Sequence, residues 1–452
     1  MLENKKIRIA NGQGFWGDSS QAPIDLVNSG NIDYLTMDYL AEVTMSIMQK
    51  QKNKNPKAGY ARDFIDFLRT SLGTIKKNKI KVITNAGGVN PIQCRQEILK
   101  IAAELGLDIK VAAITGDDIF SDIDSFISSG IPLNNLDSGE GIDSISQSIC
   151  SANVYIDSFN IAEALKLDAD IVLAGRVSDP GLVLGPCIYE FNWSENDYDL
   201  LACGTVAGHI IECGAQCSGG NYSRWYTVDN LSKVGYPIIE MSQNGEFIVT
   251  KDNNFGGLIN KFTVCEQILY ELGDPKNYIS PDVVVDFTTI SVKDLGDNKV
   301  LVEGIKGKKP TDTFKVSINY HKGYKAVGQL TISGPDAMQK ANLIVNIIWD
   351  RLSRKGFEYD KKKSEFIGHD SCHRGIGEYP DNPSEIVLRI GVMDKDRNKV
   401  NEFGKEIAPL ITNGPPGVTG FSGGRPKAQE VIAYWPTLID KKIIKTEVIC
   451  FE

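Results

Sequence analysis

The stretch VITNAGGVNPIQCRQEILKIAAELGLDIKVAAI, residues 82–114, determines the fold class. Its first residues, 82–84, are an apolar run that predicts a buried strand, and Pro91 opens a helical segment that reaches Leu105. Residues 109–114 predict a second strand. Because two strands joined by a helix usually pair in parallel, this stretch predicts a parallel sheet flanked by helices.

The same alternation of strand and helix extends in both directions from this stretch. Strands are predicted at 6–10, 33–37 and 170–174, and helices at 42–48, 60–77 and 161–167. We therefore assign residues 1–275 to an α/β domain with a mostly parallel sheet.

The second part of the chain has a different pattern. Short apolar segments separated by turn residues predict an antiparallel meander, with strands at 283–287, 299–302, 314–318 and 329–332. We assign residues 276–452 to an α+β domain with antiparallel strands and closing helices.

The composition is that of an ordinary globular protein. The chain has 452 residues, of which 42% are hydrophobic and 24% charged, and this is enough for two or three domains. Its net charge of −9 disfavours a nucleic-acid partner. Because it has neither an apolar run of about 20 residues nor a signal peptide, we expect a cytoplasmic protein without a membrane partner.

Polar residues follow several of the predicted strands. Asp18, Asp38, Asn85 and Arg176 each lie in a small-residue loop after a strand. In parallel sheets, ligands bind where such loops meet at the carboxyl ends of the strands. Each loop taken alone also fits an ordinary turn, but turn chemistry does not require Arg176, so together they predict a polar pocket.

Residues 202–220, ACGTVAGHIIECGAQCSGG, concentrate reactive side chains. They hold five glycines, one of the four histidines and three of the nine cysteines, so thiol, imidazole and carboxylate groups stand on a backbone that can approach a ligand closely. The alternative is a tight turn whose cysteines are small core side chains. The density of polar groups favours a functional site.

Two cofactor types are disfavoured by the local sequence. Residues 12–17 match the G-x-G-x-x-G spacing of a dinucleotide loop, but Phe15 and Trp16 are bulky where a phosphate must approach, so no dinucleotide is expected. His369 and His373 are four residues apart, so they would share one face and could hold a metal only if they were on a helix. The glycines on either side of them favour a polar loop instead. A second possible zinc set has no standard spacing: Cys203, His209, Cys213 and Cys217.

Motifs spread along the chain resemble the acyclic terpene utilisation AtuA family. They are NGQGFWGD at 11–18, DYLTMDYLAE at 33–42, TNAGGVNP at 84–91, GRVSD at 175–179, GHIIECGAQ at 208–216 and TNGPPG at 412–417. The resemblance implies carboxylic-acid catabolism on a branched or hydroxy carboxylate or its CoA thioester. It favours a lyase or hydratase, with a non-catalytic scaffold or acyl-CoA-binding component as the alternative.

If the chain is a hydro-lyase, as the resemblance suggests, roles can be assigned to several side chains of these motifs. His209 and Glu212 are the expected acid and base, Arg176 the partner of a substrate carboxylate, and Cys213 the nucleophile if the reaction is thioester transfer. The expected substrate-binding residues are Gly14, Asn85, Gly87, Gly88, Asp179, Gln216 and Asn413. Asp18 and Asp38 are the candidate ligands of a Mg²⁺ ion.

The chain ends earlier than longer members of that family, which carry roughly a hundred further residues, the size of a small domain. Its end at Glu452 resembles a split form. We therefore expect a separate small partner subunit and a hetero-oligomer.

Overall fold

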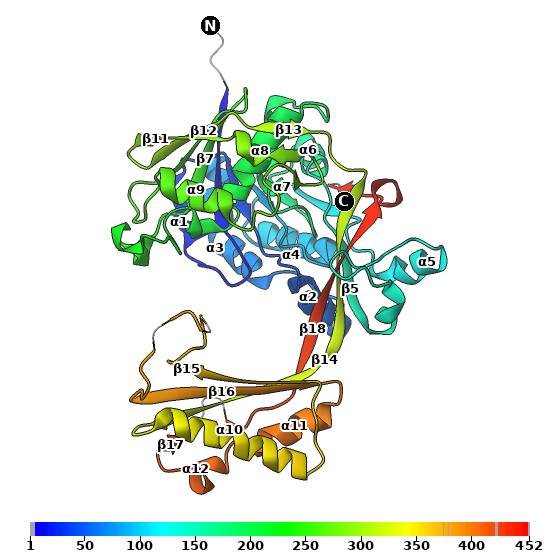
Figure 1. Ribbon diagram of the computed structural model, residues 1–452. Helices are drawn as coiled ribbons and strands as arrows, with labels where there is room; N and C mark the ends of the chain where they lie inside the picture. The colour runs from blue at the N-terminus through cyan, green and yellow to red at the C-terminus, as the bar shows by residue number, and fades with distance from the viewer. Residues whose placement is uncertain (1–4, 374, 378, 421–423, 451–452) are drawn as a thin grey trace. The chain divides into compact units, whose positions relative to one another are not determined.

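The structure is a computed structural model that describes residues 5–373, 375–377, 379–420 and 424–450. It divides into two compact units (Figure 1). Unit 1 consists of residues up to 319 together with those from 434 onward, and unit 2 consists of residues 320–433. The segment 276–319, which the sequence analysis assigned to the second domain, thus belongs to unit 1. Two paired strands continue from one unit to the other, β14 (Thr313–Ser333) and β18 (Gln429–Asp440).

A ten-stranded sheet runs through the described part of unit 1. Its centre is parallel, in the order β1 (Lys6–Gln13), β2 (Tyr34–Met37), β3 (Lys81–Thr84), β6 (Ile171–Leu173) and β4 (Val111–Thr115). Antiparallel strands extend both edges: β7 (Pro237–Ser242), β8 (Phe247–Lys251), β12 (Lys299–Glu303) and β11 (Ser291–Gly296) beyond β1, and β19 (Glu447–Ile449) beyond β4. The predicted α/β class is confirmed.

Two groups of helices flank this sheet. The first group consists of α1 (Ala22–Ser29), α3 (Arg62–Asn78) and α4 (Pro91–Glu104), and its apolar faces form a core with the parallel strands. The second group consists of α6 (Phe159–Lys166), α7 (Gly181–Phe191) and α8 (Tyr198–Ile211). Further helices of unit 1 are α2 (Thr44–Lys54), α5 (Ile123–Ser128) and α9 (Lys261–Leu269).

The first half of the glycine-rich stretch is helical. Residues 202–211 belong to α8, where Gly204 and Gly208 face α7 and its start. A Cβ atom on Gly204 would lie 2.6 Å from Leu184 Cδ1, so these glycines let two helices pack closely. The close approach that the sequence analysis expected toward a ligand is, at these two positions, made toward another helix.

The four segments predicted as one meander are strands, but they belong to three sheets. β10 (Val284–Asp286) pairs with β9 (Tyr278–Ile279) and β13 (Lys306–Lys308), whereas β12 joins the ten-stranded sheet. Both remaining segments lie within β14, which also pairs with β5 (Ile149–Val154). Alternating apolar residues predict a strand but do not specify its neighbour.

Unit 2 contains an antiparallel sheet, as expected for an α+β region. Its strands are β15 (Lys361–Ile367), β16 (Glu385–Asp394), β17 (Val418–Thr419) and the later part of β14. The helices α10 (Ala337–Arg354) and α11 (Arg397–Lys405) lie on one face of this sheet (Figure 1), and α12 (Leu410–Asn413) follows them. Among the described helices of both units, none combines the length and apolarity that crossing a membrane requires.

Candidate functional site

A cavity of about 320 Å³ lies in unit 1, next to the start of α7 and the end of α8. Pro180 and Asp179 precede α7, and His209 and Glu212 come from the last turn of α8 and the residue that follows it. The lining includes four carboxylic acids, one histidine and one lysine: Glu42, Asp179, Glu212, Glu271, His209 and Lys315. The cavity therefore offers acid–base groups in a confined space.

His209 and Glu212 form a buried pair in this cavity. Nδ1 of His209 is 3.3 Å from Oε1 of Glu212, and Nε2 is 3.3 Å from the carbonyl oxygen of Ile268. The rings of Tyr278 and Phe287 pack against the imidazole, each with its centroid 5.5 Å away. The three-residue spacing at the end of a helix places both groups on one side.

Burial and mutual attraction shift the pKa values of both groups. Burial lowers the pKa of His209, but Glu212, the backbone of Ile268 and the charge of Glu271 together raise this pKa above its ordinary value. Burial raises the pKa of Glu212 to about 7, although His209 opposes that shift. Near neutral pH the pair can both accept and release a proton, which acid–base catalysis requires.

Arg176 lies behind the cavity wall rather than in it. The side chain is fully buried, and its Nη1 and Nη2 atoms lie 2.7 and 3.1 Å from the two carboxylate oxygens of Asp179. Its guanidinium also donates to the carbonyl oxygen of Leu40 and stacks 4.1 Å from the centroid of the Tyr155 ring. The edge predicted to bind a substrate carboxylate is thus occupied by Asp179, and it is Asp179 that faces the cavity.

Lys315, near the start of β14, is the one lysine or arginine among the described residues that line the cavity. Its Nζ atom lies 4.8 Å from the centroid of Tyr155 and 5.8 Å from that of Tyr434, and no described carboxylate forms an ion pair with it. Although the side chain keeps accessible surface because it faces the cavity, desolvation lowers the pKa of Lys315. This ammonium group is available to an incoming anion or carbonyl oxygen.

The loops that follow β2 and β3 contact each other, as predicted, but they do not line the cavity. Asn85 donates to Asp38 across 2.7 Å and accepts a bond of the same length from the backbone of Tyr39. A Cβ atom on Gly87 would lie 2.5 Å from a carbonyl oxygen, and the backbone N–H of Gly88 already donates to Asn85. These residues form a buried junction between neighbouring strands and do not line the cavity.

Asp18 and Asp38 have separate partners. Asp18 accepts hydrogen bonds from the backbone of Gly14 at 3.0 Å and from the Tyr236 hydroxyl at 2.6 Å. Gly14 in turn packs on the backbone of Cys213, where a Cβ atom would come within 2.8 Å. Across the described residues, no cluster of three His, Cys, Asp or Glu side chains is arranged to hold a metal ion, so the suggested Mg²⁺ site gains no donor set there.

The remaining predicted residues lie elsewhere. Cys213 follows Glu212 outside the cavity lining, and burial raises the pKa of its thiol to about 12, so it is protonated at neutral pH. Gln216 lines a second cavity, and Asn413 accepts a hydrogen bond from Arg351 in unit 2 at 3.2 Å. His369 and His373 are in a loop and not on a helix.

Sequence reasoning missed several lining residues, namely Glu42, Tyr155, Glu271, Tyr278 and Lys315. Most of them carry no local signal, because an isolated glutamate, tyrosine or lysine between elements fits any surface. Glu271 has one structural peculiarity, a left-handed backbone with φ of 55°. This conformation is uncommon for glutamate, and such strain is found preferentially at functional sites.

Comparisons with known proteins give one informative match. The family model described as "Acyclic terpene utilisation family protein AtuA" matches residues 7–450. No curated protein matches the chain. Among solved structures, S. aureus homoserine dehydrogenase is 10% identical, with 93% of this chain and 84% of that chain covered and a TM-score of 0.12. The Thiobacillus denitrificans enzyme is also 10% identical, with 91% and 84% covered and a TM-score of 0.16. TM-scores this low carry no argument about fold or function.

Proposed function

This chain belongs to the acyclic terpene utilisation AtuA family, and on that premise we propose that it is a hydro-lyase for a small hydroxy- or branched carboxylate or its CoA thioester. The family description indicates acyclic terpene utilisation, which is a carboxylic-acid catabolic context. The observation that carries the proposal is the buried His209–Glu212 pair in the same cavity as Lys315.

Dehydration of a 3-hydroxy acid or thioester requires two proton transfers. A base removes the proton next to the carbonyl group, an acid protonates the hydroxyl at the next carbon, and water leaves as the double bond forms. In this proposal the His209–Glu212 pair supplies both functions, because burial raises the pKa of Glu212 to about 7 and His209 is the neighbour with which it can share a proton. Hydration is the same sequence in reverse.

The carbonyl oxygen gains negative charge as the proton leaves, and Lys315 is the group proposed to stabilise it. Asp179, held in place by Arg176, is the proposed acceptor for the substrate hydroxyl. Glu42 and Glu271 add further carboxylates to the lining. This excess of carboxylates disfavours polycarboxylic substrates and favours a substrate with one anionic group or a neutral thioester.

Hydrogen exchange tests the proposal without knowledge of the physiological substrate. The chain is incubated in D₂O with short 3-hydroxy acids and with their CoA thioesters, and deuterium at the carbon next to the carbonyl group is measured by mass spectrometry. We expect exchange with at least one substrate class and a loss of at least about 100-fold in Glu212→Gln, the size that general acid–base groups contribute. Glu246→Gln, on the exposed turn between β7 and β8, is the matched control.

Exchange by Glu212→Gln at the wild-type rate would refute the assignment of the pair. Tight binding of a thioester with no exchange would instead support the alternative of an acyl-CoA-binding component. The predicted small partner subunit stays a prediction, and each assay is therefore run on the chain alone and on material co-purified from the native source.

A further inference from the structure

Strand pairing fixes the position of Lys315 but leaves its amine unpaired. Its neighbours Phe314 and Val316 on β14 are buried, and its backbone carbonyl oxygen accepts a hydrogen bond of 2.9 Å from the backbone of Tyr155. The side chain lines the cavity, and its Nζ atom forms no ion pair or hydrogen bond with the described residues. The nitrogen is therefore free to react with a molecule that enters the cavity.

A second cation lies close to this amine. The Nζ atom of Lys315 is 4.8 Å from the centroid of the Tyr155 ring, and the guanidinium of Arg176 stacks on the same ring at 4.1 Å. Desolvation lowers the pKa of Lys315, and Arg176 lowers it further, whereas the carboxylates of the lining oppose this shift without reversing it. Desolvation and a neighbouring cation are the two conditions that make a lysine amine nucleophilic.

We propose that Lys315 forms a Schiff base with a small, uncharged aldehyde or ketone. The free amine attacks the carbonyl carbon, and the electron pair of the C=O π bond moves to oxygen, which takes the proton released by nitrogen. An acid then protonates the resulting hydroxyl, the C–O bond breaks, water leaves, and the nitrogen lone pair forms the C=N bond of a protonated imine. Glu212 is the proposed acid, because it lines the same cavity and burial raises its pKa to about 7.

The rest of the lining favours an uncharged carbonyl compound. Once the nitrogen of Lys315 is part of an imine, no other lysine or arginine among the described lining residues can pair with a carboxylate, and the four carboxylic acids of the lining would repel one. Apolar side chains are available to contact a hydrocarbon chain, namely Pro180, Ile279, Pro281 and Leu438.

This reaction goes beyond the proposed dehydration and does not depend on it. In the dehydration the protonated side chain of Lys315 stabilises a negative charge, whereas here its free amine forms a covalent bond. After donating its proton, Glu212 is a carboxylate and can remove a proton from the carbon next to the imine. The electrons of that C–H bond form a C=C bond, and those of the C=N π bond return to nitrogen. The product is an enamine, the carbon nucleophile of aldol addition and cleavage.

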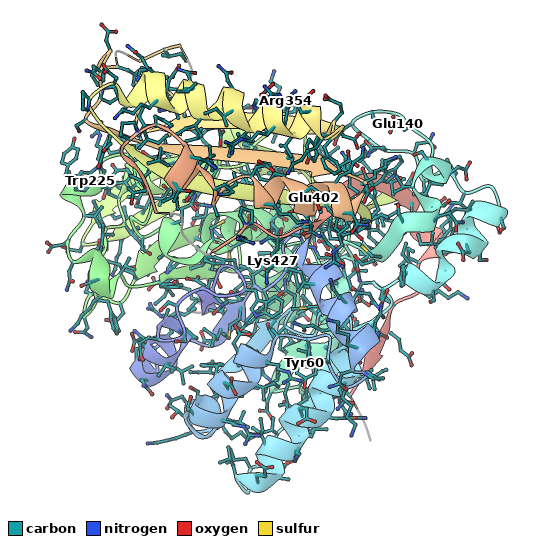
Figure 2. The ribbon with its side chains drawn as sticks, turned by 90° about the horizontal axis from the view of Figure 1, so that it is seen from below. Tyr60, Glu140, Trp225, Arg354, Glu402 and Lys427 are labelled. Atoms are coloured by element: carbon teal, nitrogen blue, oxygen red, sulfur yellow. The ribbon has the colours of Figure 1, made fainter. Side chains whose placement is uncertain are left out.

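Reductive trapping on the full chain tests the inference. The chain is incubated at neutral pH with 2-pentanone and sodium cyanoborohydride, which reduces a protonated imine to a stable secondary amine, and the alkylated lysines are located by peptide mass spectrometry. Lys293 on β11 and Lys427, which is marked in Figure 2, are exposed and serve as internal references. We expect Lys315 to be alkylated at least about tenfold faster than either reference, because general acid catalysis contributes at least that much.

A matched probe tests the substrate class. 4-Oxopentanoate has the skeleton of 2-pentanone with a carboxylate in place of the terminal methyl group. 2-Pentanone should alkylate Lys315 faster than 4-oxopentanoate does, whereas the reference lysines should show no such preference. Faster alkylation of Lys315 by the anion would overturn the assignment to an uncharged substrate.

The control is the same chain unfolded in urea, where the advantage of Lys315 should disappear because the cavity no longer exists. In Lys315→Arg, which keeps the charge but has no amine, the fast alkylation of the intact folded chain should be lost. Alkylation of Lys315 at the rate of the reference lysines would overturn the inference, and this comparison within the wild-type chain does not require the variant to fold. Trapping uses a ketone and no hydroxy acid, so its outcome is separate from that of the deuterium-exchange test.

Discussion

A Cβ atom at position 208 would lie 2.5 Å from the carbonyl oxygen of Pro180, so Gly208 is the contact between α8 and the start of α7. This contact adjoins both His209 and Asp179 in the chain. The packing of two helices and the geometry of the cavity therefore depend on the same glycine.

Gly208→Ala should destabilise the fold and disturb the cavity. Overpacking in a tight core lowers the free energy of unfolding by about 1–3 kcal/mol, which urea denaturation can measure. Gly73→Ala is the control, because Gly73 lies in α3 and a Cβ atom added there would have nothing within 4 Å. There alanine should instead stabilise the helix by about 0.5–1 kcal/mol. Equal effects at both positions would contradict the packing argument.

Glu212 should make stability depend on pH. Its pKa is raised from 4.5 to about 7 by burial, so the folded chain holds a proton that the unfolded chain has released. The resulting stabilisation is complete below pH 4.5 and is lost as the pH rises through about 7. The pKa of His209 is also raised, so its contribution has the same sign.

Relative to Glu212→Gln, the wild-type chain should lose on the order of 1–3 kcal/mol of unfolding free energy between about pH 5 and pH 8. Urea denaturation at several pH values within that range measures the difference. If the unfolding free energy of the wild-type chain instead rose with pH relative to that of Glu212→Gln, the Glu212 carboxylate would be stabilised by its surroundings, and the prediction would be wrong.

The Arg176–Asp179 pair should behave as one unit. Arg176→Met leaves Asp179 without its bidentate partner, and because the Asp179 side chain is 36% exposed we expect a cost of about 1–3 kcal/mol, below that of a fully buried pair. The double variant with Asp179→Asn should cost less than the sum of the two single variants, because it leaves no unpaired charge. Unfolding free energies of all four chains form the cycle, and additive effects would show that the pair is uncoupled.

Lys315→Met should weaken ligand binding without weakening the fold. No described carboxylate pairs with this ammonium group, so its removal breaks no ion pair. We expect the affinity for a short carboxylate to fall about tenfold, equivalent to about 1.4 kcal/mol, with the melting temperature unchanged or higher. Calorimetric titration measures the affinity, and Lys293→Met on the exposed strand β11 is the control. Equal affinities would remove Lys315 from the site.

Local elements were predictable from the sequence, whereas long-range pairing was not. Apolar periodicity located α3 and the parallel strands to within a few residues, because burial of one face leaves a repeating pattern. No such pattern shows that residues 447–449 pair with β4, or that β12 joins β8. Those pairings depend on contacts between segments far apart in the chain.

The candidate site was only partly predictable, because some of its residues are brought together from distant parts of the chain. His209 and Glu212 were identified because they are close in sequence and chemically distinctive. Lys315 was missed because β14, from a distant part of the chain, brings it to the cavity. Arg176 was found, but its role was not, since charge alone does not reveal that its partner lies three residues away.

The left-handed backbone of Glu271 has a consequence for protein engineering. Glycine or asparagine would adopt a φ of 55° with less strain than glutamate does. A directed search for thermostable variants should therefore select those two residues at position 271. Each would remove a carboxylate from the cavity, so the most heat-resistant variants chosen at this position would also be the ones with an altered binding site.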